Sequence, residues 1–184
     1  SAAGTYVSTD GGLNWVSSSN PHFTGWKDLA MSSDGSIIMG VESFGSNIYV
    51  STDTGSNWNG VAVTASGQWR GISISADGQL AVALQDNSVY VSSNGGSSWS
   101  ENVEETWQGV AVAGDKSKII AADEDNELLF ISSDGGSTFS NVTSLSSSNI
   151  LIQLGHDCLT YTRKTFKFFI SFRNFAFIFF NEYF

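Results

Sequence analysis

Short apolar segments alternate with turn sequences along most of this chain. Residues 71–75 place isoleucine at alternate positions, which is the period of a strand with one buried face. Residues 80–84 are apolar at every position, as in a strand that is covered on both faces. Asp77-Gly78 lies between the two segments and supplies a turn. No clear apolar period of 3.6 residues runs through residues 1–148, so the pattern predicts strands.

This order of segments recurs along the chain. Trp26, Trp69 and Trp107 each begin a segment that is followed by a turn, an apolar segment and a further strand. The expected strands are 5–8 and 15–17, then 26–32, 37–41 and 47–50, then 69–75, 80–84 and 88–91, and last 107–113, 119–122 and 128–131.

An eight-residue sequence, which we call the octad, closes each series. It reads S-T-D-G-G-L-N-W at 8–15, S-T-D-T-G-S-N-W at 51–58, S-S-N-G-G-S-S-W at 92–99 and S-S-D-G-G-S-T-F at 132–139. The third positions, Asp10, Asp53, Asn94 and Asp134, are 43, 41 and 40 residues apart. Glycine supplies the positive φ of a tight turn, and the aspartate can accept hydrogen bonds from its own turn.

Four-stranded antiparallel units of about 40 residues are the blades of a β-propeller. We therefore predict an all-β propeller fragment of about three and a half blades within residues 1–148. The half blade spans 1–18, and the full blades span about 26–63, 69–103 and 107–145.

Residues 149–184 have a different composition. Nine of the thirteen phenylalanines lie in 166–184, and Gly155 is the last glycine. The segment 166–180 is shorter than the roughly 20 residues a spanning helix needs, and it contains Lys167 and Arg173. We therefore predict an atypical aromatic-rich tail that is not native to the repeat protein, and no membrane span.

The net charge of the chain limits the classes of partner that it is expected to bind. The net charge is -10 and the pI is about 4.3, which disfavours nucleic acid and anionic membranes as partners. The acidic balance suits solubility, a cation or a basic protein partner. Cys158 is the one cysteine, so neither an intrachain disulfide nor a cysteine zinc site is possible. We predict no cofactor and no metal.

The octad S-x-D-x-G-x-x-W resembles the Asp-box, or BNR repeat, and the chain resembles Asp-box β-propellers across residues 1–145. That resemblance covers sialidases, xyloglucan-cleaving glycosidases, sortilin-type receptors and photosystem II assembly and stability factors, and the paired pattern looks most like the last group. It implies structural octads on the blade periphery, with buried aromatic residues. The positions carried over are Asp10, Gly12, Trp15, Asp53, Gly55, Trp58, Asn94, Gly96, Trp99, Asp134, Gly136 and Phe139.

Catalytic chemistry is not predicted. The resemblance implies three arginines in a sialidase site, whereas residues 1–148 contain only Arg70. Other glycosidases need two carboxylates on either side of one bond, and carboxylates are plentiful here. The loops that should share one face of the blades form the candidate binding face, with Glu42, Asp86, Glu104, Glu105, Asp123, Glu124 and Asp125.

Three interpretations of the candidate binding face stay open: solvated loop charges, a surface for a basic protein, and a cation site. Asp28 also stands out, because glycine occupies the same repeat position at 71 and 109. The preferred function is a non-catalytic scaffold for protein binding or complex assembly, of the photosystem II assembly-factor kind. The alternative is a fragment of a secreted glycoside hydrolase, xyloglucanase-like rather than sialidase-like, with a glycan as ligand. A secreted protein or one of the thylakoid lumen is expected.

Overall fold

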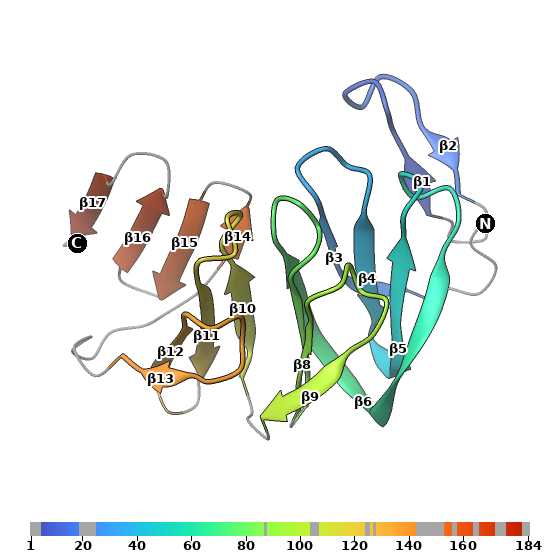
Figure 1. Ribbon diagram of the computed structural model, residues 1–184. Helices are drawn as coiled ribbons and strands as arrows, with labels where there is room; N and C mark the ends of the chain where they lie inside the picture. Colours follow the sequence, from blue (N-terminus) through green and yellow to red (C-terminus); the bar gives the residue numbers. More distant parts are fainter. Residues whose placement is uncertain are drawn as a thin grey trace.

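The computed structural model is built from β-strands (Figure 1). It describes residues 5–18, 25–86, 88–103, 107–123, 126 and 128–142, and in the tail only the courses of four strands. No helix occurs in these parts of the chain. The all-β class predicted from the apolar pattern is confirmed.

The largest sheet is antiparallel and has seven strands in chain order. They are β3 Trp26–Met31, β4 Ile38–Glu42, β5 Phe44–Ser51, β6 Asn59–Ile74, β7 Ala81–Gln85, β8 Ser88–Ser92 and β9 Ser100–Val103.

The long strand β6 belongs to two blades. Its first part pairs with β5 and its last part pairs with β7 (Figure 1). The sequence pattern predicted a break between blades here, between residues 63 and 69. The strand is continuous because β5 begins early, so that Phe44 and Gly45 pair with Gln68 and Gly67 and keep the linking segment extended.

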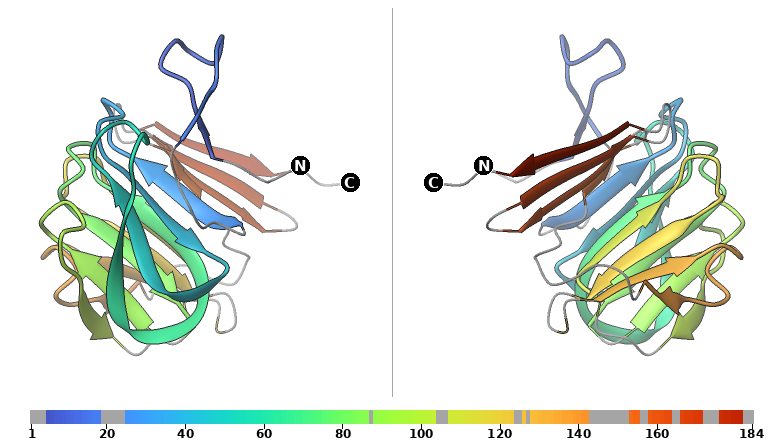
Figure 2. Two further views of the ribbon diagram at one scale, coloured as in Figure 1. Left: turned by 90° about the vertical axis from the view of Figure 1, so that its right-hand side faces the viewer. Right: turned by 90° about the vertical axis from the view of Figure 1, so that its left-hand side faces the viewer.

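The third blade is a separate four-stranded antiparallel sheet. It contains β10 Gly109–Val112, β11 Ile119–Asp123, β12 Leu128–Ser132 and β13 Ser140–Asn141. The predicted half blade is a two-stranded sheet of β1 Tyr6–Val7 and β2 Val16–Ser17, which projects from one end of the molecule (Figure 2).

Neighbouring blades are joined by backbone hydrogen bonds at equivalent turns. The amide of Ser33 donates to the carbonyl of Ala76 at 2.8 Å, and the amide of Ala76 donates to the carbonyl of Gly114 at 3.0 Å. The same bond thus recurs at both junctions between the three full blades. This recurrence indicates that these blades follow one another with a similar geometry.

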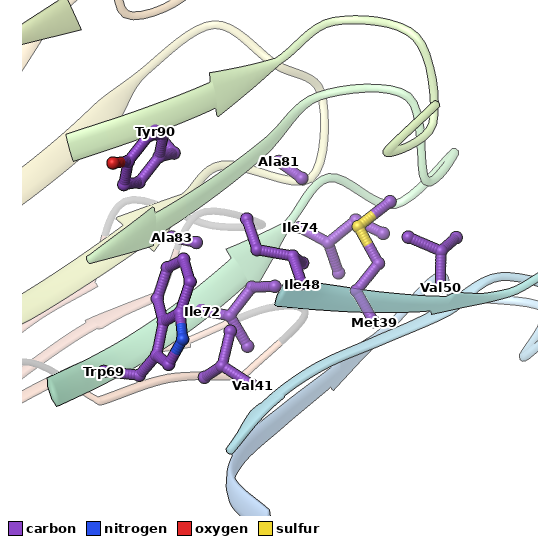
Figure 3. Close-up of a cluster of buried hydrophobic side chains, with 10 residues drawn as sticks. All are labelled: Met39, Val41, Ile48, Val50, Trp69, Ile72, Ile74, Ala81, Ala83 and Tyr90. Carbon is purple, nitrogen blue, oxygen red and sulfur yellow. The ribbon is translucent and has the colours of Figure 1, made fainter. Parts of the chain in front are cut away.

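The core lies between blades. Met39 and Val41 of β4 pack against Ile72 and Ile74 of β6, with Trp69 also in the cluster (Figure 3). A second cluster of the same kind joins the β6–β9 blade to the β10–β13 blade. β7 is buried along its whole length, as its continuous apolar sequence predicts.

The tail contains four strands that the sequence pattern did not predict. They are β14 Gln153–Gly155, β15 Cys158–Arg163, β16 Phe166–Ser171 and β17 Ala176–Asn181, in one antiparallel sheet. β14 lies beside β10 (Figure 1). The sheet has the strand order of a blade but carries no octad.

Candidate functional site

The candidate binding face is built at the ends of the second strand of each blade. Glu42, Gln85 and Asp123 end β4, β7 and β11. Glu42 pairs across the sheet with Trp26, and Gln85 pairs with Trp69. In these two blades, the same edge therefore carries a polar strand end and a tryptophan.

Asp86 fixes the junction between β6 and β7. Its Oδ2 accepts a hydrogen bond from the Gln68 amide at 2.8 Å, and its Oδ1 lies 3.1 Å from an Arg70 guanidinium nitrogen. The two charged side chains are each 41% exposed. The one arginine of the repeats is therefore engaged by a carboxylate of its own blade.

Asp123 is 5% exposed, and both of its carboxylate oxygens are bound by Asn126. The amide of Asn126 donates to Oδ1 at 3.0 Å, and its side-chain nitrogen donates to Oδ2 at 2.8 Å. Glu42 is half-buried, and burial raises the pKa of its carboxyl. The Tyr49 hydroxyl donates to Glu42 Oε2 at 3.4 Å.

Gln85 lies at the same strand end, although its uncharged side chain is not among the predicted residues of the face. Its side-chain nitrogen donates to the Gly45 carbonyl at 2.7 Å, across the junction with the preceding blade. The repeat alignment could have found it, because Gln85 occupies the position of Glu42 and Asp123. The structure thus places one polar side chain per blade at this position.

The other predicted members of the face, Glu104, Glu105, Glu124 and Asp125, lie outside the described residues. Among the described residues, no three His, Cys, Asp or Glu side chains are grouped closely enough to hold a metal ion.

The octads form closed turns. In the second octad, Asp53 Oδ1 accepts the Asn57 amide at 2.8 Å and the Ser51 hydroxyl at 2.9 Å. Asp53 Oδ2 accepts from the Asn57 side chain at 2.7 Å. Asp10, Asn94 and Asp134 make the equivalent bonds in the other octads through Oδ1. The third residue of each octad therefore binds the first and the seventh.

These bonds should give the acidic octads a pH dependence that the Asn94 octad lacks. Bonds from Thr138 and Ser132 lower the pKa of Asp134 to about 2. A lowered folded-state pKa means that the carboxylate's contribution is complete above pH 4 and is lost as the pH falls through about 2. We expect the Thr138 amide proton shift to titrate there by NMR. The Ser98 amide, bound to Asn94, should not move, and equal movement of both would contradict the assignment.

The glycine at the fifth position of the octad lies at the interface between neighbouring blades. A Cβ on Gly96 would lie 2.8 Å from Val50 Cγ2 and 2.9 Å from Met39 Cε, both in the preceding blade. A Cβ on Gly55 would likewise lie 2.7 Å from Val7 Cγ2. The octad is therefore an inter-blade contact as well as a turn.

The carbonyl of this octad glycine also accepts hydrogen bonds from the preceding blade. Gly55 O accepts from Trp58 Nε1 at 3.0 Å and from the hydroxyl of Ser18, the residue that follows strand β2 of the half blade. Gly136 O accepts from Asn102 Nδ2 at 2.6 Å. Ser18 and Asn102 occupy equivalent repeat positions.

The octad aromatic residues are less buried than expected. Trp58, Trp99 and Phe139 are half-buried, and the Trp58 ring lies 4.9 Å from that of Trp26. Trp15 is 63% exposed, so the expectation of burial is wrong at this position. The reason is that β1 and β2 form a sheet of only two strands in the described chain.

The tryptophans that begin the first strands differ in their polar contacts. Trp26 Nε1 donates to Thr5 Oγ1 at 2.9 Å. Trp69 and Trp107 are almost completely buried, and their indole nitrogens have no partner among the described residues. The positions equivalent to Thr5 are Ile48 and Val89, which have no acceptor. The two later repeats thus contain the indole without the hydroxyl.

Restoring the hydroxyl should offset the usual cost of burying it. Val89→Thr is nearly isosteric and places an acceptor beside Trp107 at the position equivalent to Thr5, so the net change in the free energy of unfolding should lie within about 0.5 kcal/mol. Val82→Thr, at an equally buried valine, is the control and should destabilise by about 1–3 kcal/mol. Urea unfolding of both variants measures the difference. Equal losses would show that the Trp107 indole does not reach residue 89.

Asp28 joins the innermost strands of two blades. Its Oδ2 accepts the Ile72 amide at 2.9 Å, and its Oδ1 accepts the Leu29 amide at 2.9 Å. Burial is the largest cause of the raised pKa of this carboxyl. At the next junction the Ser73 hydroxyl accepts the Val112 amide at 3.0 Å. Asp28 therefore serves as an inter-blade acceptor, which the glycine at position 71 cannot.

Replacing Asp28 should separate its acceptor role from its charge. Asp28→Ala leaves the Ile72 amide without this acceptor and should cost about 1–3 kcal/mol, whereas Asp28→Asn keeps an oxygen there and should be as stable as the parent or more so at pH 7. A raised folded-state pKa means that this group's contribution increases as the pH falls, opposite to the octads. Denaturant titrations at neutral and acidic pH measure both effects. Equal losses for the two variants would contradict the acceptor role.

No family model matches the chain. No curated protein matches it either. Among solved structures, the GH74 enzyme of Niastella koreensis is similar with a TM-score of 0.64 and 17% identity, over 89% of this chain and 27% of that chain. The GH74 xyloglucanase of Xanthomonas campestris is similar with a TM-score of 0.65 and 14% identity, over 84% of this chain and 25% of that chain.

YCF48 bound to D1 peptide is also similar, with a TM-score of 0.62 and 12% identity, over 85% of this chain and 55% of that chain. The chain thus spans between 25% and 55% of the lengths of these three proteins. Identities this low show the fold alone. The predicted fold class, a fragment of a β-propeller, is confirmed. In the described part of the chain, no helix is long and apolar enough to cross a membrane.

Proposed function

We propose that this chain is part of a non-catalytic β-propeller scaffold that binds a protein segment on the candidate binding face, with Asp-box octads as its structural turns. The observation that carries the proposal is that the described carboxylates of this face bind groups of their own loops. Asp86 and Asp123 hold their own loops, and Arg70 is engaged by Asp86. These side chains shape the loops and give the face its charge.

A peptide ligand is supported by the propeller comparison. YCF48, which is similar in fold, has been solved bound to D1 peptide. The repeats of this chain resemble the photosystem II assembly factors in their octads and tryptophan-headed strands. An acidic face favours a ligand segment with basic residues, because opposite charges speed encounter and fix orientation.

The test is direct binding of labelled D1 peptide by fluorescence anisotropy, at low and at raised salt. Binding that weakens as salt increases is expected. Glu42→Gln should weaken it by up to about fivefold, as for one surface charge pair. Asp115→Asn removes the same charge from the turn at the opposite end of β11 and should have no effect. Absence of binding to D1 peptide and to a generic basic peptide would refute the proposal.

A glycoside hydrolase fragment is the second candidate. The similarity to two GH74 proteins favours it, because one of those matches covers 89% of this chain. Release of reducing sugar from xyloglucan by the protein, lost on replacement of a carboxylate of the face, would support this candidate over the scaffold. Binding of xyloglucan without cleavage would indicate a glycan ligand and no catalysis.

A further inference from the structure

The third octad differs from the others in the residue that holds its turn. Asn94 occupies the position that is aspartate in the other three octads, and Gly95 follows it. In an Asn-Gly sequence the asparagine side chain is open to attack by the next backbone nitrogen, because glycine is conformationally free and has no side chain to hinder the approach. The chain contains one other such sequence, Asn59-Gly60.

The reaction open to these two residues is deamidation. The Gly95 nitrogen loses its proton and attacks Asn94 Cγ, the bond from Cγ to Nδ2 breaks, and Nδ2 leaves as ammonia. Water then opens the cyclic imide, adding its oxygen to one ring carbonyl carbon and returning a proton to the ring nitrogen. Opening at Cγ gives aspartate, whereas opening at the backbone carbonyl gives a β-linked isomer. Water is the only co-reactant, and asparagine is one of the thermolabile residues.

The folded turn engages both reacting groups in hydrogen bonds. The Gly95 amide donates to the Gln79 carbonyl at 3.0 Å, so the attacking nitrogen is bound to another turn. Asn94 Oδ1 accepts from the Ser92 hydroxyl at 2.9 Å and from the Ser98 amide at 3.1 Å. Asn94 Nδ2 donates to the Ser98 hydroxyl at 2.8 Å. Cyclisation requires these bonds to open, so its rate follows the fraction of molecules in which the octad is open.

The same turn can hold the aspartate product. Asp134 Oδ2 accepts from the Thr138 hydroxyl at 2.6 Å, in the position where Asn94 Nδ2 donates to Ser98. A serine hydroxyl can donate or accept, so Ser98 can reverse its bond when the amide becomes a carboxylate. Both bonds to Oδ1 come from donors and stay as they are. Aspartate thus keeps every side-chain bond of the octad, whereas the isomer lengthens the main chain of the turn by one methylene.

We propose that Asn94 is a site of deamidation, gated by the hydrogen bonds of the third octad, and that the turn retains the aspartate that forms. The modification converts the amide octad of the β6–β9 blade into the acidic kind of the other octads. It adds one negative charge at an exposed position and makes this octad sensitive to acid. The octad follows β8 at the end opposite to Ser88, which pairs with Gln85 beside the candidate binding face. The proposal is therefore independent of what that face binds.

Trypsin separates the two Asn-Gly sequences, so each can be followed by mass spectrometry. Cleavage after lysine and arginine places Asn59 in peptide 28–70 and Asn94 in peptide 71–116. The purified full chain is incubated at mildly alkaline pH, folded and in urea, and the fraction of peptide 71–116 converted from amide to acid is measured over time. Conversion at Asn94 in the folded chain should be at least about tenfold slower than in urea.

Two serines of the same octad provide a matched pair of variants. Ser98→Ala removes the hydroxyl that binds Nδ2, and loss of this bond should raise the folded-state rate about two- to tenfold. Ser97→Ala removes a hydroxyl that is also exposed and does not bind Asn94 among the described residues, so it should leave the rate unchanged. Equal folded-state rates for the two variants, or reaction of the folded parent as fast as in urea, would overturn the proposal.

Asn94→Asp tests the product directly and decides this part of the proposal even if Ser98→Ala folds poorly. Its Tm at neutral pH should be no lower than that of the parent, and the Ser98 amide proton shift should now titrate in acid, as expected for Thr138. A lower Tm, or a Ser98 shift that does not move, would show that the turn does not hold the aspartate. Asn94→Gln should abolish conversion in peptide 71–116, and persistent conversion there would assign the reaction to another residue.

Discussion

Trp69→Ala is expected to lower the free energy of unfolding by about 3–5 kcal/mol. Trp69 is 0% exposed, and its ring centroid lies 5.8 Å from that of Tyr90. It lies on β6, which two blades share, so the loss of its ring affects both. Its indole nitrogen has no partner among the described residues, so the cost is one of packing and not of a broken hydrogen bond.

Urea and thermal unfolding measure this effect. For a chain of this size, a loss of that magnitude corresponds to a fall in Tm of about 6–20 °C. Trp69→Phe keeps an aromatic ring and removes the unpartnered nitrogen, so it should cost clearly less. Trp15→Ala removes a tryptophan that is 63% exposed and should change stability by no more than about 1 kcal/mol. Similar losses for Trp15→Ala and Trp69→Ala would contradict the picture of the core.

Gly96→Ala should be the most costly of the small changes, because it combines two penalties. Gly96 has a φ of +78°, where a side chain costs roughly 1–2 kcal/mol. The added methyl would also enter the space of Val50 and Met39, and overpacking of this kind costs about 1–3 kcal/mol. The total is about 2–5 kcal/mol.

Gly12→Ala is the matched control. Gly12 occupies the same octad position with a φ of +89°, and the nearest atom to an added Cβ is 3.8 Å away, in Trp15. It should therefore show only the backbone penalty. The difference between the two variants in denaturant unfolding isolates the inter-blade contact. If both lose the same stability, the octad glycine acts in its own turn alone.

Much of the local structure was predictable from the sequence. Alternation in residues 71–75 and the apolar segment 80–84 predicted strands that the structure contains. The octads predicted turns, because Asp53 with glycine two residues later supplies both an acceptor and a positive φ. Gln85 was not among the residues predicted for the candidate binding face, because those were selected by charge, whereas Gln85 shares only the repeat position of Glu42 and Asp123.

Other features depend on contacts between blades, which no local pattern reports. β6 is continuous because residues 44–45 of the preceding hairpin pair with it. The aromatic octad residues follow one pattern, yet Trp58 is half-buried and Trp15 exposed, because burial depends on the neighbouring strands. In the sequence, Asp28 stands out only because the other repeats have glycine at this position. Its hydrogen bond with the Ile72 amide forms only where the two blades meet.

The sequence by itself determined the strands, the octad turns and the repeat, since these follow from apolar period, glycine and hydrogen bonding within about eight residues. Only the tertiary structure decided what each repeat position contacts. Gly55 and Gly96 are identical in sequence terms to Gly12, but each lies against the valine of a preceding blade. Leu29 and Ile72 also share a position, yet one is exposed and the other buried, because apolar burial is a property of the neighbouring blade.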